Sequence, residues 1–408
     1  MRLVALTILS TSFLFANAIT SIAATEMVLH NFTGPVGNEG SYPIGDLVRD
    51  TFGNLYGTTR YGGANGAGVV FELMNGNGSW SEKTIYAFTG GRDGDWPMSG
   101  VILDPNGNLY GTTYGGGASG AGTVFMLASN GKGDWKETVL YSFAGGTDGA
   151  NPLAGLEFDQ SGDLYGTTYY GGANGVGTVF RLSLASGIST ETVLHSFGWA
   201  GKDGAFPDSA LLIDKAGDLF GTTQYGGSGN CAHGGSGCGV VFSITHSRDF
   251  RRWTEKVLHR FSGRDGSSPM TRLAMGPYGY MYGTTNYGGI YDLGVAFAIK
   301  HTPKGWVETV LHDFGGPGDG AFVRAGLTID AAKNLYGTTQ GNASGNGTVY
   351  RLKYANGHWT ETVLYSFGNY PDGSQPLGGV IVDSTGNLYG TTDLGGSANE
   401  GTVFEIAP

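Results

Sequence analysis

The sequence predicts an all-β fold, a seven-bladed β-propeller made of four-stranded antiparallel blades. Its main evidence is a repeated tetrapeptide, Tyr-Gly-Thr-Thr with one Phe variant, which occurs seven times at spacings of 53 to 62 residues. Its copies begin at Tyr56, Tyr110, Tyr165, Phe220, Tyr282, Tyr336 and Tyr389. A second marker, an apolar run that ends in Phe, also occurs seven times, at Phe32, Phe88, Phe143, Phe197, Phe261, Phe314 and Phe367. No stretch shows the 3.6-residue apolar period of a helix, and units of this length with four strands are typical of propeller blades.

The composition agrees with a turn-rich β-protein. Glycine accounts for 76 of the 408 residues, while 40% of the residues are hydrophobic and 12% aromatic. Such a chain has enough apolar side chains to bury a core, which argues against disorder. The formal net charge of −11 argues against a nucleic-acid partner, because binding to phosphates needs clustered positive charge.

The first 24 residues have the pattern of a secretory signal peptide. Met1-Arg2 is followed by an apolar run from Leu3 to Phe15 and by small residues that end at Ala24. Residues 25–408 are predicted to form one seven-bladed propeller domain. We therefore expect a secreted or periplasmic protein, monomeric, without a membrane span once the signal peptide is removed.

One unit, residues 138–192, shows how a blade is built. Four short β-branched or aromatic runs lie at 138–143, 155–159, 164–168 and 178–182, and turn residues rich in Gly, Asp, Asn and Pro separate them. An open β-solenoid is the competing architecture. Its repeats are usually shorter, which favours the propeller.

The run Gly-Leu-x-x-Asp is predicted to be the innermost strand, because small residues at its start allow close backbone approach around the axis. These residues are Gly100, Gly155, Ala210, Gly326 and Gly379. In this frame the last blade lacks an outer strand. Residues 27–32 must then pair antiparallel with residues 401–406 and close the ring. A rival frame places residues 27–32 at the axis.

The two cysteines, Cys231 and Cys238, lie in a glycine-rich insertion within the longest spacing. An exported chain and a short loop favour a disulfide. The alternative is a metal pair assisted by His233, which would offer fewer ligands than a zinc site usually has.

The repeated pattern Tyr-Gly-Thr-Thr-x-x-Gly-Gly…Gly-Thr-Val-Phe resembles that of the GloVer tandem-repeat family of exported bacterial proteins. Units such as 152–182 and 376–406 match that repeat almost from end to end. The resemblance implies an exported, propeller-like protein and supplies no catalytic residues. Members are often attached to the cell surface by a C-terminal anchor. Because the residues Glu405–Pro408 show no sorting signal, the expectation here is a free product.

Breaks in the repeat pattern mark a candidate site near the axis. Asp46 and Arg272 replace the small residue at the start of the inner strand, and Asp208 and Arg324 lie two positions earlier in their units. Arg49 and Glu157 fall within inner strands. Charges near the axis need partners or water, so they predict a polar central mouth. The alternative is that these residues pair with one another around a water-filled channel.

Aromatic residues mark the loops that this frame places on one face. Tyr61, Tyr170, Tyr225 and Tyr287 follow the tetrapeptide, and Trp96, Phe206 and Phe322 precede the inner strand. Their flat rings could stack on sugars. The alternative is that each Tyr packs beneath its own loop.

The Asp-Gly pairs of the repeat have a structural interpretation. The Asp of an Asp-Gly pair recurs in six units and is expected to cap loop N–H groups, although calcium binding is an alternative. These residues are Asp93, Asp148, Asp203, Asp265, Asp319 and Asp372.

Two further positions recur on the outer run. A His or Tyr occurs there in all seven units, and in five units a Trp precedes a Glu by two positions. We assign both to packing and predict no metal site, because positions related by ring symmetry cannot converge on one ion.

Familiar catalytic motifs are absent from the sequence, including G-x-S-x-G, H-E-x-x-H and a P-loop. The leading hypothesis is therefore a non-catalytic scaffold that binds a glycan or a protein on its loop face, without a cofactor. The alternatives are a carbohydrate-active hydrolase or lyase that uses Asp46, Glu157, Asp208, Arg272 or Arg324, and a structural protein of the cell envelope.

Overall fold

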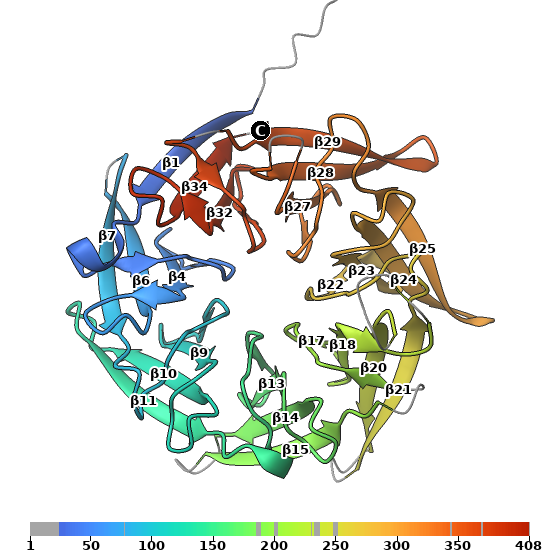
Figure 1. The fold of residues 1–408 in the computed structure, drawn as a ribbon, viewed down its shortest axis with the longest axis horizontal. Helices are drawn as coiled ribbons and strands as arrows, with labels where there is room; N and C mark the ends of the chain where they lie inside the picture. The colour runs from blue at the N-terminus through green and yellow to red at the C-terminus, as the bar shows by residue number, and fades with distance from the viewer. Residues whose placement is uncertain are drawn as a thin grey trace, which may run out of the picture.

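The protein is a closed ring of seven four-stranded antiparallel sheets around a central axis, as Figure 1 shows. This computed structural model describes residues 24–407 apart from 77, 185–188, 200–202, 230, 232–236, 248–251, 343–344 and 369. The described residues contain strands, turns and short 3-10 segments and no α-helix. The predicted seven-bladed propeller is therefore confirmed, whereas the signal peptide lies almost entirely outside the described residues. No helix in the described part of the chain is long and apolar enough to cross a membrane.

Each blade runs from a two-residue inner strand to a long outer strand. Blade 1 contains β3 (Val48–Arg49), β4 (Leu55–Thr59), β6 (Val69–Gly76) and β7 (Ser79–Ala87). Blade 2 contains β8 (Ile102–Leu103), β9 (Leu109–Thr113), β10 (Thr123–Ser129) and β11 (Trp135–Ser142). Blade 3 contains β12 (Glu157–Phe158), β13 (Leu164–Thr168), β14 (Thr178–Ser183) and β15 (Thr190–Ser196). Blade 4 contains β17 (Leu212–Ile213), β18 (Leu219–Thr223), β20 (Val240–His246) and β21 (Trp253–Arg260).

The remaining blades repeat this order. Blade 5 contains β22 (Ala274–Met275), β23 (Tyr280–Thr285), β24 (Val295–Thr302) and β25 (Gly305–Asp313). Blade 6 contains β26 (Thr328–Ile329), β27 (Leu335–Thr339), β28 (Thr348–Ala355) and β29 (His358–Ser366). Blade 7 contains β31 (Ile381–Val382), β32 (Leu388–Thr392), β34 (Thr402–Ala407) and, from the other end of the chain, β1 (Thr25–Asn31).

The N-terminal strand closes the ring as predicted. β1 pairs antiparallel with β34, with Thr25 opposite Ala407 and Asn31 opposite Thr402. Leu29 and Val403 belong to the same buried cluster, so the rival frame is wrong. Thr391 Oγ1 in blade 7 also donates to the Gly45 carbonyl in the segment that leads into blade 1, at 3.3 Å. The first and last blades are thereby held by contacts at the rim and near the axis.

The repeated tetrapeptide is explained residue by residue in blade 1. The Tyr56 hydroxyl donates to Asp50 Oδ2 (3.2 Å) and Glu72 Oε1 (2.9 Å), which fixes the turn before β4. Gly57 has no Cβ because the ring of Phe71 occupies that space, with Cζ 2.6 Å from where a Cβ would lie. Thr58 donates to the Ser99 carbonyl of the segment that leads into the next blade (2.6 Å). Thr59 donates to the Tyr61 carbonyl (2.8 Å), which shapes the loop that follows.

The recurring tryptophans pack between blades, as predicted. Trp135 of blade 2 lies edge-on to Tyr56 of blade 1, with ring centroids 6.0 Å apart, and Trp80 of blade 1 contacts Tyr389 of blade 7 at 6.2 Å. Equivalent pairs are Tyr165–Trp253, Phe220–Trp306 and Tyr282–Trp359. Each of these blades therefore uses the Tyr or Phe of its tetrapeptide as a packing surface for its neighbour.

The predicted disulfide is confirmed. Cys231 and Cys238 are bonded, with their Cα atoms 5.5 Å apart, and Cys238 is fully buried in the cluster between blades 4 and 5. His233, the proposed metal-site partner, lies outside the described residues. A disulfide is consistent with an oxidising compartment.

Candidate functional site

Four of the six charged residues predicted near the axis line one central cavity of about 430 Å³, to which every blade contributes. They are Asp46, Asp208, Arg272 and Arg324. The small inner residues have the predicted effect: a Cβ on Gly100 would lie 2.1 Å from the Asp46 carbonyl oxygen. The inner segments of blades 1 and 2 thus touch through their backbones, and side chains larger than glycine fit only elsewhere around the cavity.

Asp208 and Arg324 occupy equivalent positions in their units, two residues after Phe206 and Phe322. The other five units place an apolar side chain there: Ile44, Met98, Leu153, Met270 and Leu377. Burial raises the pKa of Asp208 to about 7, although the nearby Arg324 guanidinium opposes the shift. Among the described residues, Asp208 makes neither a side-chain hydrogen bond nor an ion pair within 4 Å, so its carboxyl group faces the cavity without a protein partner.

A second acidic group, which the sequence analysis missed, lies near Arg324. Burial raises the pKa of Asp393 to about 6, and Arg60 and Arg324 oppose that shift. Arg60 lies over the ring of Tyr61, with 4.7 Å from Cζ to the ring centroid. Both Arg60 and Asp393 directly follow the tetrapeptide, a position that varies between units and carries a charge only in these two, which is a signal that could have found them.

The other charged inner residues are used within the fold. Arg272 of the segment leading into blade 5 forms an ion pair with Glu157 of blade 3, with 2.6 Å between Nη2 and Oε2. Asp46 Oδ1 accepts the Gly379 N–H at 2.6 Å, which joins the segments leading into blades 1 and 7. The alternative of mutual pairing is therefore correct for Arg272 and Glu157, whereas Asp46 is paired with a backbone N–H. We call Asp208, Arg324, Asp393 and Arg60 the polar mouth: the first two line the cavity, and Asp393 interacts electrostatically with Arg324 and Arg60.

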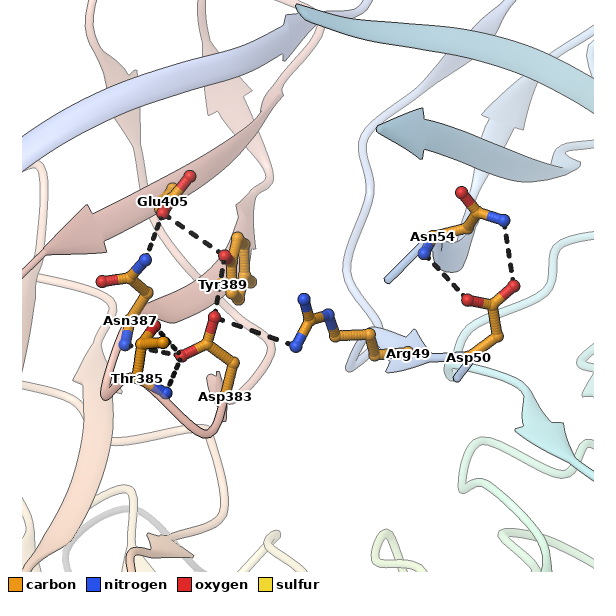
Figure 2. Close-up of polar contacts among 8 residues, drawn as sticks. All are labelled: Arg49, Asp50, Asn54, Asp383, Thr385, Asn387, Tyr389 and Glu405. Atoms are coloured by element: carbon orange, nitrogen blue, oxygen red, sulfur yellow. Dashed lines mark hydrogen bonds and ion pairs between the residues drawn. The ribbon is translucent and has the colours of Figure 1, made fainter. Parts of the chain in front are cut away.

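Figure 2 shows that Arg49 also has a structural role. Its guanidinium reaches Asp383 of blade 7, with 3.8 Å between Nη1 and Oδ2, and lies over the ring of Tyr389. Asp383 in turn accepts the Thr385 and Asn387 N–H groups at 2.8 and 3.0 Å. Arg49 is thus a link between the first and last blades at the end of the inner strands opposite the loop face.

The two predicted loop sets do share one face, because they pair with each other. In blade 1, β2 (Gly40–Ser41) pairs with β5 (Tyr61–Gly62). In blades 4 and 7, β16 (Gly204–Ala205) pairs with β19 (Tyr225–Gly226), and β30 (Gly373–Ser374) pairs with β33 (Leu394–Gly395). Single bridges such as Ala150–Tyr170 occupy the same place in the other blades.

Three of the four predicted Tyr residues meet a ring of the next blade, whereas Tyr225 meets a ring of its own blade. Tyr61 lies 6.1 Å from Trp96, Tyr170 lies 5.7 Å from Phe206, and Tyr287 lies 5.7 Å from Phe322, all measured between ring centroids. Tyr225 contacts Phe206 at 5.9 Å. The sequence analysis missed four further rings of this face: Tyr42, Tyr114, Tyr169 and Trp199.

One position on this face has a left-handed backbone in all seven units and is never glycine. Its residues, with φ between 55° and 62°, are Tyr42, Trp96, Asn151, Phe206, Ser268, Phe322 and Gln375. The N–H of Trp96 donates to the Ala67 carbonyl of the preceding blade, and its carbonyl accepts from Tyr114 N. The other six residues make the same two hydrogen bonds. We call these residues the left-handed ring; they precede the cavity-lining residues by two positions.

The Asp-Gly carboxylates cap their loops as predicted. Asp93 Oδ2 accepts the Thr89 N–H at 2.8 Å, and Asp372 Oδ2 accepts the Gly368 N–H at 2.6 Å. These carboxylates, and that of Glu39 at the equivalent place before Gly40, also meet the recurring His or Tyr and a Glu from the outer strand of the next blade. We call these groups the junction clusters. Three of them contain His30, Glu39 and Glu82; His195, Asp203 and Glu255; and His259, Asp265 and Glu308.

Comparison with known proteins identifies the repeat. The model of the Gloeobacter/Verrucomicrobia repeat matches residues 15–233 and 229–408. No curated protein sequence matches the chain.

Three solved structures align with the chain at low sequence identity. The extracellular domain of a putative hybrid two-component system from B. thetaiotaomicron aligns with a TM-score of 0.55 at 10% identity, over 92% of this chain and 39% of that one. This chain thus spans about two fifths of that structure. A putative 6-phosphogluconolactonase from Bacteroides uniformis has a TM-score of 0.49 at 13% identity, over 78% and 83% of the two chains. A putative oxidoreductase (glucose dehydrogenase) from Thermus thermophilus has a TM-score of 0.43 at 14% identity, over 94% and 100%.

Proposed function

Because the chain belongs to the Gloeobacter/Verrucomicrobia repeat family and folds as a closed ring, we propose that it is an exported, non-catalytic scaffold that binds a glycan on its loop face. The disulfide between Cys231 and Cys238 supports export. The binding site would be the left-handed ring, together with the polar mouth below it.

The left-handed ring is the observation on which this proposal rests. A side chain at positive φ costs free energy that glycine avoids, and the cost is greatest for bulky residues. This chain uses glycine at positive φ in many other turns, among them Gly62, Gly116 and Gly171. The seven residues of the ring share one conformation and differ in side chain, so the backbone does not dictate their identity. Strain that is retained in this way is typical of functional sites.

The chemistry of the face fits a neutral glycan. Paired aromatic rings such as Tyr61 with Trp96 offer flat apolar surfaces for sugar rings, and the mouth supplies carboxyl and guanidinium groups for hydroxyls. The net charge of −11 disfavours a strongly anionic polymer. This face alternates rings with Asn, Gln and charged groups, which gives sugar hydroxyls hydrogen-bonding partners beside the flat rings.

The proposal is tested with a panel of neutral oligosaccharides on an array, followed by calorimetric titration of those that bind. We expect Trp96→Ala and Phe206→Ala each to weaken binding by at least about tenfold, the loss of one aromatic contact. Phe52→Ala and Tyr278→Ala are matched controls, because these rings are 87% and 86% exposed in the turns at the opposite end of the blades. Equal weakening by the control variants, or no binding to any glycan, would contradict the proposal.

The catalytic alternative is tested first at Asp208. Glu157 and Arg272 are paired with each other, which leaves Asp208 as the cavity carboxyl with a strongly raised pKa. New reducing ends released from a bound oligosaccharide, and lost in Asp208→Asn, would establish catalysis. Binding without product release supports the scaffold.

A further inference from the structure

The junction clusters lie at the rim of the ring, away from the proposed glycan site. Each joins the outer strands of two consecutive blades through the loop between them. In the cluster between blades 3 and 4, for example, His195 belongs to β15, Asp203 to the following loop and Glu255 to β21. Three separate segments therefore bring their side chains to one point.

The three clusters defined above have the spacing of metal ligands. In each, one imidazole nitrogen and two carboxylate oxygens lie within 4.8 Å of one another. The Nε2–carboxylate distances are 3.2 Å for His195–Asp203, 3.0 Å for His259–Asp265 and 3.5 Å for His30–Glu39. Ligands about 2.0–2.1 Å from a tetrahedral ion are about 3.3 Å apart, so these pairs already have the required separation.

Several of these atoms make no hydrogen bond within the described part of the chain. Glu255 Oε1, Glu308 Oε1 and His30 Nε2 are buried without a hydrogen bond among the described residues. The central carboxylates, in contrast, are held in place: Gly198 N–H donates to Asp203 Oδ2 at 3.0 Å, and Ser262 N–H donates to Asp265 Oδ1 at 2.7 Å. Unpaired buried acceptors beside an oriented carboxylate are the arrangement that a cation stabilises.

We propose that these three junction clusters each bind one divalent transition-metal ion of the zinc type. The ligands would be one imidazole nitrogen and two carboxylate oxygens, with water in the fourth position. This donor set of nitrogen and oxygen without thiolate suits zinc better than a soft ion such as Cu(I). Each ion would cross-link two neighbouring blades, and the ion at His30 would link the blade that contains both ends of the chain to blade 1.

Three junctions with Tyr at the His position can be compared with the three His clusters within the same protein. Three other junctions have Tyr in place of His and keep both carboxylates: Tyr86 donates to Asp93 at 3.0 Å, Tyr141 to Asp148 at 2.6 Å and Tyr365 to Asp372 at 2.9 Å. A His→Tyr substitution therefore turns a proposed metal site into a junction that the fold already uses. It removes the nitrogen ligand without emptying the position.

The experiment measures zinc bound by the full-length protein after chelator treatment and re-addition of ZnCl₂, by elemental analysis and calorimetric titration. We expect the triple variant His30→Tyr, His195→Tyr, His259→Tyr to bind three zinc ions fewer than the wild type, one for each cluster. Each single variant should bind one fewer. Zinc should raise the melting temperature of the wild type and leave that of the triple variant unchanged.

Two controls make the result specific. His301→Tyr changes an exposed histidine outside the clusters and should leave the zinc content unaltered. Circular dichroism of each variant in chelator confirms that it is folded. Uptake by the triple variant equal to that of the wild type, or no uptake by the chelator-treated wild type, would overturn the proposal.

Discussion

Asp208 occupies a position at which five of the seven units place an apolar side chain. Its carboxyl group is drawn into the cavity beside Tyr169 and Tyr225, whose own pKa values are raised mainly by burial and further by this acid. Burial disfavours the charged form, so the residue destabilises the fold at neutral pH. A residue that lowers stability and has no structural partner is typical of a functional site.

Because burial of the charged Asp208 carboxylate destabilises the fold, we expect Asp208→Asn to change the stability in a pH-dependent way. The folded-state pKa of about 7 lies above the usual 3.8. The folded protein therefore retains a proton that the unfolded chain has lost, and stability falls as the pH rises from about 4 to about 7. Asp208→Asn should be more stable than the wild type by about 1–3 kcal/mol at pH 8 and equally stable at pH 4, as measured by denaturant unfolding.

The matched control is Asp46→Asn, which lines the same cavity and accepts a backbone hydrogen bond from Gly379. It should show no gain at pH 8. A difference between wild type and Asp208→Asn that is the same at both pH values would contradict the assignment of the raised pKa.

At the scale of the element, the loop before each inner strand is a hydrogen-bonded link between blades. Its left-handed residue donates to one blade and accepts from its own, and in six of the seven units a proline follows. The two hydrogen bonds hold this residue in a conformation that it would otherwise avoid, and Phe322, which is followed by Val323, adopts the same conformation without a proline. The loop thus positions a side chain at the mouth, at the expense of backbone strain.

Ser268 provides the test of that strain, since its side chain is small and its φ is 55°. Ser268→Gly and Ser268→Ala both remove the hydroxyl group, but only glycine relaxes the left-handed backbone. We expect the glycine variant to be more stable than the alanine variant by about 1 kcal/mol in thermal or denaturant unfolding. Equal stability, or a more stable alanine variant, would show that the backbone is not strained there.

Features formed within one repeat unit could be predicted from the sequence, whereas contacts between blades could not. Spacing and turn residues located the blades, the inner strand and the disulfide, because these depend on contacts within one unit. The pair Arg272–Glu157 joins segments of blades 5 and 3, and the clusters such as His195–Asp203–Glu255 join two blades. Such contacts depend on the radius and tilt of the ring, which no local pattern encodes. The recurring His or Tyr, Asp and Glu were each visible in the sequence, but their meeting was not.

At the scale of the whole molecule, the ring is closed by one strand from the far end of the chain. β1 covers the edge of β34 and gives blade 7 the four strands of the other blades, and Leu29 and the following Phe32 are buried. An uncovered edge would expose backbone donors and acceptors and favour aggregation. Stability of the complete ring should therefore depend on this strand and not on which end of the chain carries it.

Removal of residues 24–31 should lower the free energy of unfolding by more than about 3 kcal/mol, since it exposes an apolar cluster and a sheet edge. A circular permutant is the control. Because Thr25 lies opposite Ala407, a short hairpin loop can join them, and new ends can be opened at Val36, which is 96% exposed. The permutant should regain most of the lost stability in denaturant unfolding. A truncated protein as stable as the wild type would contradict this account of closure.

The pairing of Thr25 with Ala407 also sets an order of events in time. A ribosome releases β1 first and its partner last, so the early strand waits, unpaired, while the other blades are made. Long-range pairing of this kind slows folding, and a strand without its partner is the segment most exposed to wrong associations. The proposed export fits this order, because a chain that crosses a membrane before it folds cannot complete its ring until the last strand has followed.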